Sequence, residues 1–130
     1  MALWAGGIPS ELAPQLTVGM AALTDLVMAQ DEPATQESIR RLLGRTKPGA
    51  AEYSPLHRLP TGTQAIVAAA TADDVAPPSR ARDFAEQANM GGDTVAVVEV
   101  PGNDSSFLDP GDAAWKNVAE ILTRQFGADL

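Results

Sequence analysis

Side chains able to carry out acid–base or nucleophilic chemistry are few in this sequence. It has one histidine, His57, and no cysteine. The lack of cysteine excludes disulfides, thiolate nucleophiles and cysteine-ligated metals, and a single histidine excludes sites that need several imidazoles. What remains is a set of carboxylates and hydroxyls in short polar segments: Asp25, Asp73, Asp74, Asp104, Ser105 and Ser106.

Three of these carboxylates, on Asp73, Asp74 and Asp104, offer the oxygen ligands that Mg²⁺ or Ca²⁺ prefers. Nothing in their spacing fixes a coordination geometry, so we expect solvated loop acids and no metal site. The glycine pairs Gly6-Gly7 and Gly91-Gly92 lack the lysine and the strand-to-helix context of a phosphate-binding loop. We therefore expect no cofactor.

The histidine and one serine near the N-terminus are weak candidates for catalysis. His57 precedes the second predicted strand, which places it at the end opposite to the carboxyl ends of the strands, so we expect a surface or packing role. Ser10 lies between Pro9 and Glu11, without the glycines that would expose its hydroxyl.

Length and charge set the class of protein. The 130 residues suffice for one domain, and 45% hydrophobic with 20% charged residues is typical of a globular protein. Seventeen acidic residues against nine basic ones give a net charge of −8, which argues against nucleic acid and anionic membranes as partners. The sequence has no basic leader and no apolar run of roughly 20 residues, so we expect a cytoplasmic protein.

The elements that must position these side chains follow from the apolar pattern. Three continuous apolar runs are typical of buried parallel strands: Leu16 to Leu23, Ala65 to Ala70 and Thr94 to Val100. Helices are predicted from Thr35 to Gly44, from an N-cap at Ser79 to Gly91, and from an N-cap at Asp112 to Gly127, after an opening apolar segment from Ala2 to Ala13. One apolar stripe marks the last helix: Trp115, Val118, Ala119, Leu122 and Phe126. This alternation predicts an α/β fold, a small three-layer arrangement of a short, mostly parallel sheet with helices on both faces.

The polar residues named above come directly after the predicted strands. Asp25 follows the first strand, Asp73 and Asp74 the second, and Asp104 to Ser106 the third. Ligands of open α/β sheets bind outside the carboxyl ends of the strands, so a ligand is expected near Asp25, Asp73, Asp104 and Ser105. Aspartate and serine are also the usual residues of helix caps and turns, and that role stays open for all of them.

Taken together, the segments resemble the C-terminal half of an α/β-hydrolase, of the esterase, kynurenine formamidase-like and prolyl oligopeptidase-like branch. The resemblance covers essentially the whole chain, as one truncated domain over residues 1–130. The segments that carry it are Ala2-Leu3-Trp4-Ala5, Thr17 to Leu26, Ala70 to Pro77 (ATADDVAP) and Phe107 to Pro110 (FLDP).

The resemblance implies that Asp73 occupies the position of the acid of a Ser-His-Asp triad. The histidine of the family falls in the stretch Gly102 to Phe107, where Asp104 or Ser105 stands instead. No Gly-x-Ser-x-Gly nucleophile motif occurs. We therefore expect a non-catalytic hydrolase-like protein that acts by binding or assembly, with Asp25, Asp74 and Ser106 as further binding residues. The alternatives are part of a split or truncated serine hydrolase that needs another chain, or a repurposed enzyme in which Asp73 and Asp104 form an acid–base pair.

The first predicted strand also points to a partner. In the resembled fold it is internal, so here the strand Leu16 to Leu23 is expected to expose an apolar edge without protecting charges. We expect two copies to pair through this edge as a homo-oligomer, or a separate chain with the N-terminal half of a hydrolase to cover it.

Overall fold

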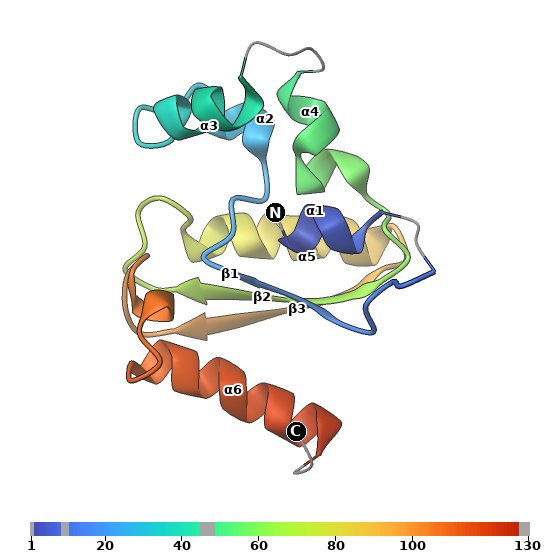
Figure 1. Ribbon diagram of the computed structural model, residues 1–130, viewed down its shortest axis with the longest axis vertical. Helices are drawn as coiled ribbons and strands as arrows, with labels where there is room; N and C mark the ends of the chain where they lie inside the picture. The colour runs from blue at the N-terminus through green and yellow to red at the C-terminus, as the bar shows by residue number, and fades with distance from the viewer. Residues whose placement is uncertain (1, 9–10, 45–48, 128–130) are drawn as a thin grey trace.

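The computed structural model describes residues 2–8, 11–44 and 49–127. Three parallel strands, β1 (Thr17–Met20), β2 (Gln64–Ala70) and β3 (Thr94–Val100), lie in the order β1-β2-β3 (Figure 1). The helices are α1 (Ala2–Gly6), α2 (Leu26–Ala29), α3 (Gln36–Leu43), α4 (Ala50–Tyr53), α5 (Pro78–Met90) and α6 (Ala113–Phe126), with 3₁₀ turns η1 (Pro55–Arg58) and η2 (Ser106–Leu108).

The predicted three-layer α/β fold is confirmed. Helices α1 and α5 cover one face of the sheet and α6 covers the other (Figure 1). Side chains of β2 alternate between the two cores: Val67 packs with Phe84 on the α5 side, and Ala68 packs with Phe107 and Val118 on the α6 side. Alanine predominates in β2, and its short side chains allow the layers on both faces to approach the strand closely.

The strand boundaries agree with the sequence except at β1. Strand β3 has the predicted ends and β2 begins one residue early, whereas β1 stops at Met20 instead of Leu23. The cause is Ala21, whose φ of 48° lies in the left-handed region and turns the chain out of the sheet. The nitrogen of Ala21 still donates to the Ala68 carbonyl at 3.0 Å, so the departure begins immediately after this bond.

The predicted cap of α6 is confirmed, whereas the predicted cap of α5 and the predicted apolar stripe of α6 are wrong. Asp112 accepts a bond from the Ala114 nitrogen at 2.8 Å and caps α6 as predicted. Ser79 is not a cap, because α5 begins at Pro78, whose missing N–H and fixed φ suit a first helical position. In α6, Ala114 and Val118 are buried whereas Ala119 is exposed, so the apolar stripe is rotated from the predicted one.

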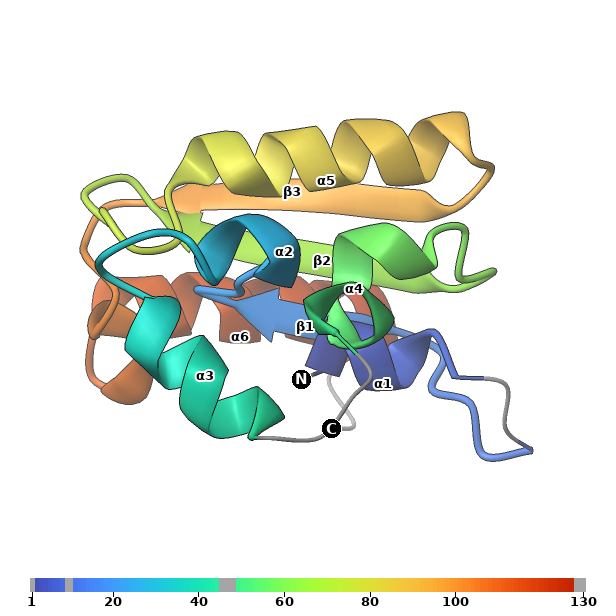
Figure 2. The same ribbon diagram turned by 90° about the horizontal axis from the view of Figure 1, so that it is seen from above.

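Helices α2, α3 and α4 form a separate small helical layer on the α1 and α5 side of the sheet, farther from the strands than α1 and α5 (Figure 1), and Figure 2 shows this layer from above. Its core consists of four buried residues: Leu26, Ala29, Ile39 and Ala50. Arg80, near the start of α5, forms an ion pair with Glu32 between α2 and α3, and so links α5 to this helical layer. The hydroxyl of Thr24 also donates to the Arg80 carbonyl at 3.4 Å.

Helix α1 packs unusually close to β1 because both contribute glycines at the contact. A Cβ on Gly19 would lie 3.0 Å from Leu3 Cγ, and one on Gly6 would lie only 2.2 Å from Thr17 Oγ1. The Thr17 hydroxyl is buried there, and no described residue forms a hydrogen bond with it. The contact therefore depends on the absence of side chains at two positions. Within the described part of the chain, every helix is too short or too polar to traverse a lipid bilayer.

Candidate functional site

Asp73 is the most buried carboxylate of the polar set, with 3% of its surface exposed. It lies in the turn between β2 and α5, where its Oδ1 accepts bonds from the backbone nitrogens of Val75 and Ala76, both at 2.8 Å. This local pattern is the one in which aspartate replaces a backbone carbonyl in a turn. It fixes the orientation of the carboxylate.

The second carboxylate oxygen, Asp73 Oδ2, is buried and has no hydrogen-bond partner among the described residues. A buried polar atom without a partner costs free energy and calls for an explanation. Here one oxygen is held by the turn while the other stays available to one further donor. A fixed carboxylate with a free oxygen is the arrangement that orients an imidazole N–H in acyl-transfer chemistry.

The loop after β3 is joined directly to the Asp73 turn. The nitrogens of Thr71 and Ala72 donate to the carbonyls of Val100 and Gly102, at 2.9 and 2.8 Å. The position at which the resembled family carries histidine is therefore adjacent to the acid turn, as predicted from the carboxyl ends of β2 and β3.

Three polar side chains of that loop, those of Asn103, Ser105 and Ser106, form hydrogen bonds within the loop. Asn103 Oδ1 accepts from the nitrogen of Ser105 at 3.0 Å and from its hydroxyl at 2.7 Å. Ser106 is buried, and its oxygen accepts from the Asn103 nitrogen at 3.0 Å. Asp104 is exposed, unlike the buried Asp73, so the proposed acid–base pair would join two carboxyl groups in very different environments.

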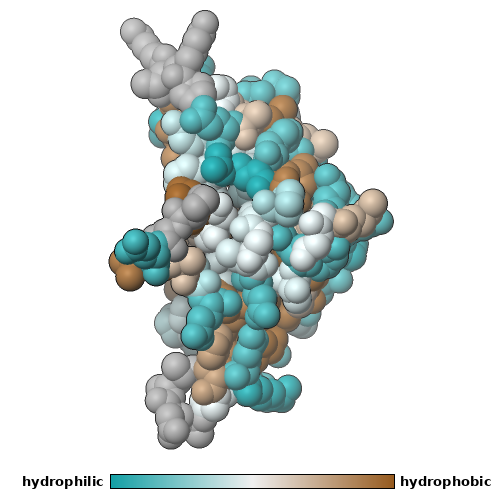
Figure 3. Space-filling model, turned by 90° about the vertical axis from the view of Figure 1, so that its right-hand side faces the viewer, coloured by the Kyte–Doolittle hydropathy of each residue, from teal (hydrophilic) through white to brown (hydrophobic). Residues whose placement is uncertain are grey.

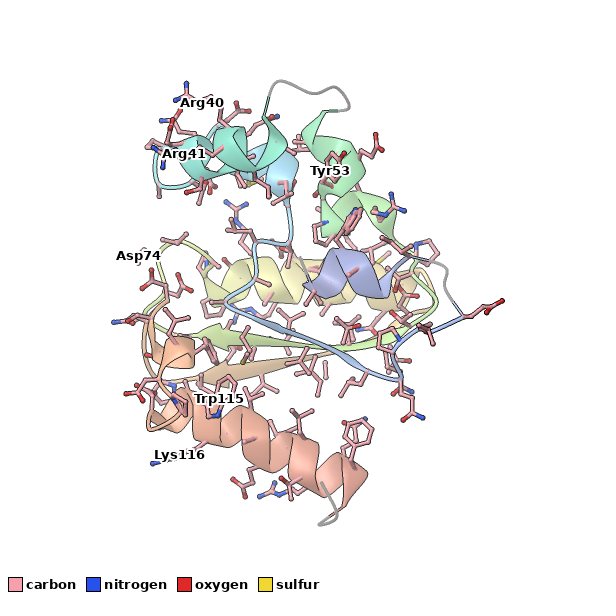
Figure 4. The ribbon with its side chains drawn as sticks, viewed as in Figure 1. Arg40, Arg41, Tyr53, Asp74, Trp115 and Lys116 are labelled. Carbon is pink, nitrogen blue, oxygen red and sulfur yellow. The ribbon has the colours of Figure 1, made fainter. Side chains whose placement is uncertain are left out.

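The other two predicted binding residues, Asp74 and Asp25, have different surroundings from each other. Asp74 is exposed and projects from the turn after β2 (Figure 4). Asp25 caps α2 by accepting from the Met28 nitrogen at 3.1 Å, the structural role that the sequence left open. The cavity beside Asp25, Val75 and Ala76 measures about 10 Å³, the volume of a single water probe.

The expected separation of His57 from the residues after the first strand is wrong. The helical layer folds back so that the Leu56 nitrogen donates to the Thr24 carbonyl at 2.8 Å, and His57 Nδ1 lies 3.9 Å from Asp25 Oδ1. The same Nδ1 is 3.0 Å from the Ser54 hydroxyl oxygen. A Ser-His-Asp triad needs serine and acid on opposite ring nitrogens, so this group is not one.

Ser54 itself has a structural role that the sequence analysis did not predict. It is fully buried and accepts from the Leu26 nitrogen at 3.0 Å. It joins the start of α2 to the turn before η1, which are 28 residues apart. The only local signal is its place before Pro55, which is typical of a turn.

An apolar groove runs along the free side of β1, between α1 and the helical layer. Its volume is about 430 Å³, and the described residues that line it are all uncharged. The rings of Trp4 and Tyr53, which are among the lining residues, are tilted against each other with centroids 5.9 Å apart, and Tyr53 reaches from α4 toward α1 in Figure 4. The lining comes from α1, β1 and the segment after it, and the helical layer: Ala2, Leu3, Trp4, Val18, Gly19, Met20, Ala21, Ala22, Leu23, Leu26, Ile39, Leu42, Tyr53 and Pro55.

Metal ligands do not gather anywhere in residues 2–8, 11–44 and 49–127, since no group of three or more histidine, aspartate or glutamate side chains is placed to hold an ion. Asp73, Asp74 and Asp104 are thus not brought together as a cation site. Ser10 lies outside the described residues.

Sequence comparison finds no matching protein family and no matching curated protein. Comparison of structures finds the same fold in esterase 2 of Thermogutta terrifontis. The form phosphonylated by sarin superposes with a TM-score of 0.66 at 20% identity, over 87% of this chain and 43% of the esterase chain. The form phosphoramylated by tabun gives 0.64 at 20% identity, over 88% and 42%.

The butyrate-bound form of the same thermophilic esterase gives a TM-score of 0.61 at 20% identity, over 94% of this chain and 50% of the esterase chain. The chain therefore spans half or less of the length of these esterases. The predicted relation to α/β-hydrolases is confirmed at the level of the fold.

Proposed function

We propose that this chain is the acid-bearing part of an esterase-type acyl hydrolase, that it is not catalytic on its own, and that it works by assembly with a further polypeptide. The observation that carries the proposal is the carboxylate of Asp73. Its Oδ1 is held by two backbone N–H groups, while its buried Oδ2 has no partner within residues 2–8, 11–44 and 49–127. The esterase-like fold supports it at the level of the scaffold.

The chemistry needs three parts. A serine hydroxyl attacks the acyl carbon, an imidazole takes its proton, and a carboxylate orients the imidazole through a hydrogen bond to its N–H. Asp73, with one oxygen held by the turn, is the residue that we propose for the third part. The loop beside it carries Asn103, Asp104 and Ser105 and no imidazole, and the sequence has no Gly-x-Ser-x-Gly motif. The base and the nucleophile must then come from the polypeptide that completes the assembly.

A second candidate is a binding protein without any catalytic role, assembled as a homodimer through β1. The uncharged groove along that strand favours it, because an open apolar edge of a sheet is usually covered by a partner. A repurposed enzyme with Asp73 and Asp104 as acid and base is less well supported, since Asp104 is exposed to solvent.

The test of the catalytic part uses the purified chain with a fluorophosphonate probe and a p-nitrophenyl ester. We expect no labelled serine and no turnover above the rate in buffer, because no base lies beside Asp73. Labelling of a serine accompanied by ester turnover in the isolated chain would contradict the proposal.

The role of Asp73 is tested by supplying the missing imidazole. The variants Asp104→His and Ser105→His each introduce a histidine into the loop that is bonded to the Asp73 turn. In at least one of them we expect a strongly deshielded, slowly exchanging imidazole N–H in the proton NMR spectrum, which Asp73→Asn abolishes. If neither variant shows this signal, Asp73 does not have the orientation of a triad acid. The separate binding-protein candidate predicts no such signal.

A further inference from the structure

We propose that the free edge of β1 is a strand-addition site, at which an extended and uncharged segment of a different polypeptide pairs with Val18 and Met20 and fills the groove beside α1. The inference rests on the proposed function in that it names the surface and the kind of partner through which the assembly forms. Its physical basis is the direction of the backbone groups in β1, which is independent of Asp73.

The hydrogen bonds of β1 show which residues face outward. The nitrogen of Ala21 donates to Ala68 of β2, and in a parallel strand alternate residues direct their N–H and C=O groups to the same side. The backbone N–H and C=O groups of Thr17 and Gly19 therefore point toward β2. Those of Val18 and Met20 point to the open side of β1. A partner strand at this side can form a regular ladder with them.

The opposite edge of the sheet is protected in a way that β1 is not. The carbonyl of Val100 accepts a hydrogen bond from the Thr71 nitrogen, so the backbone groups of Val100 point toward β2. By the same alternation, the backbone groups of Val95, Val97 and Glu99 point outward. The side-chain amide of Asn89 bonds both the nitrogen and the carbonyl of Val95, each at 2.9 Å. Glu99 is paired with Arg82 at 2.6 Å. A charged side chain on the edge strand, and another part of the same chain bonded to its backbone groups, are two features that keep edge strands from pairing.

The surroundings of β1 select an uncharged partner. The chain has a net charge of −8, yet residues 15–24 contain no charged side chain, and every lining residue of the groove that the structure describes is uncharged. A charged side chain brought into this groove would lose its hydration without gaining an ion pair. By contrast, on the side of the molecule at the amino ends of the strands, hydrophilic side chains lie among the hydrophobic ones (Figure 3).

The position of α1 favours a different polypeptide over a second copy. Figure 2 shows α1 on the outer side of β1, away from β2. A twofold axis through paired β1 strands would bring α1 of both copies to the same face of the joint sheet, each projecting toward the other. A single added strand meets no such obstacle. The matched esterase chains are at least twice as long as the part this chain covers, so in them the fold continues beyond the matched part.

The experiment measures binding of a defined strand to the whole chain. The probe is a fluorescein-labelled peptide, Thr-Val-Thr-Val-Thr-Val with a Ser-Gly pair at each end. Val18→Pro removes one outward N–H and leaves the bonds to β2 in place; Val97→Pro does the same at the protected edge and is the matched control. We expect saturable binding to the unmodified chain, at least tenfold weaker binding to Val18→Pro, and binding within twofold for Val97→Pro.

Each other outcome overturns the proposal. No saturable binding to the unmodified chain excludes a strand-addition site, and equal weakening by both variants excludes β1 as its location. If Val18→Pro fails to fold, the same peptide with methylated amides replaces it, and unchanged binding of that peptide excludes backbone pairing. A dimer of the chain alone in sedimentation equilibrium, dissociated by Val18→Pro, assigns the edge to a second copy instead. None of these readouts involves ester turnover, so they are separate from the tests of Asp73.

Discussion

Replacing Gly6 with alanine is expected to lower the free energy of unfolding by about 3 kcal/mol, the upper end of the range for overpacked contacts. The added Cβ would lie 2.2 Å from Thr17 Oγ1 and 3.1 Å from Thr17 Cβ. Thr17 is 7% exposed and lies in β1, so it has little room to move. Helix α1 must then lift from the strand, which exposes the buried Leu3 and removes one wall of the groove.

Urea unfolding followed by circular dichroism measures this effect, and two further variants test its cause. Gly49→Ala adds a methyl group where no atom lies within 4 Å, so its effect is expected to stay within about 0.5 kcal/mol. In the Gly6→Ala background, Thr17→Ala removes the clashing oxygen and should restore part of the loss, since contacting residues are coupled. A Gly6→Ala protein as stable as the unmodified one would show that α1 does not pack on β1 in this way.

The second large effect is expected at Asp73. Substitution by alanine removes the acceptor of two backbone N–H groups, and Ala76, which carries one of them, is buried. Leaving a buried donor without a partner costs about 1–3 kcal/mol, so we expect Asp73→Ala to lower the free energy of unfolding by about 2–4 kcal/mol. Asparagine keeps an oxygen at the Oδ1 position, and Asp73→Asn should cost about half as much.

The same denaturation assay separates this role from a general effect of charge. Asp74→Ala removes the neighbouring carboxylate, which is exposed, and should change stability by less than about 0.5 kcal/mol. Equal losses for the alanine variants at 73 and 74 would mean that the hydrogen bonds of Asp73 do not hold the turn. The proposed orientation of its free oxygen would then lose its support.

The sheet was predictable because its strands are short, continuous apolar runs separated by clear breaks. β3 has the predicted ends for this reason, and Asp112 caps α6 where an acceptor precedes a helical pattern. The premature end of β1 was not predictable. It depends on a left-handed φ at Ala21, and alanine is not a residue whose presence indicates that conformation.

The candidate site was predictable in its positions and not in its bonds. Asp73 follows a buried apolar run, so its place at the carboxyl end of β2 was predictable from the sequence. The bonds that divide its two oxygens into one held and one free depend on the path of a few loop residues. The contact of His57 with Asp25 joins residues 32 positions apart through three short helices, and no local pattern encodes it.

The unequal edges of the sheet also limit how far this chain can associate. Because Asn89 occupies the outward groups of Val95 and the ion pair of Glu99 lies farther along β3, β1 is the less protected of the two edges in the part of the chain that the structure describes. Head-to-tail stacking of sheets into a filament requires two open sides on every unit. If strands add at β1 alone, as proposed, we expect pairing to end after a single step and to give a finite complex instead of a polymer.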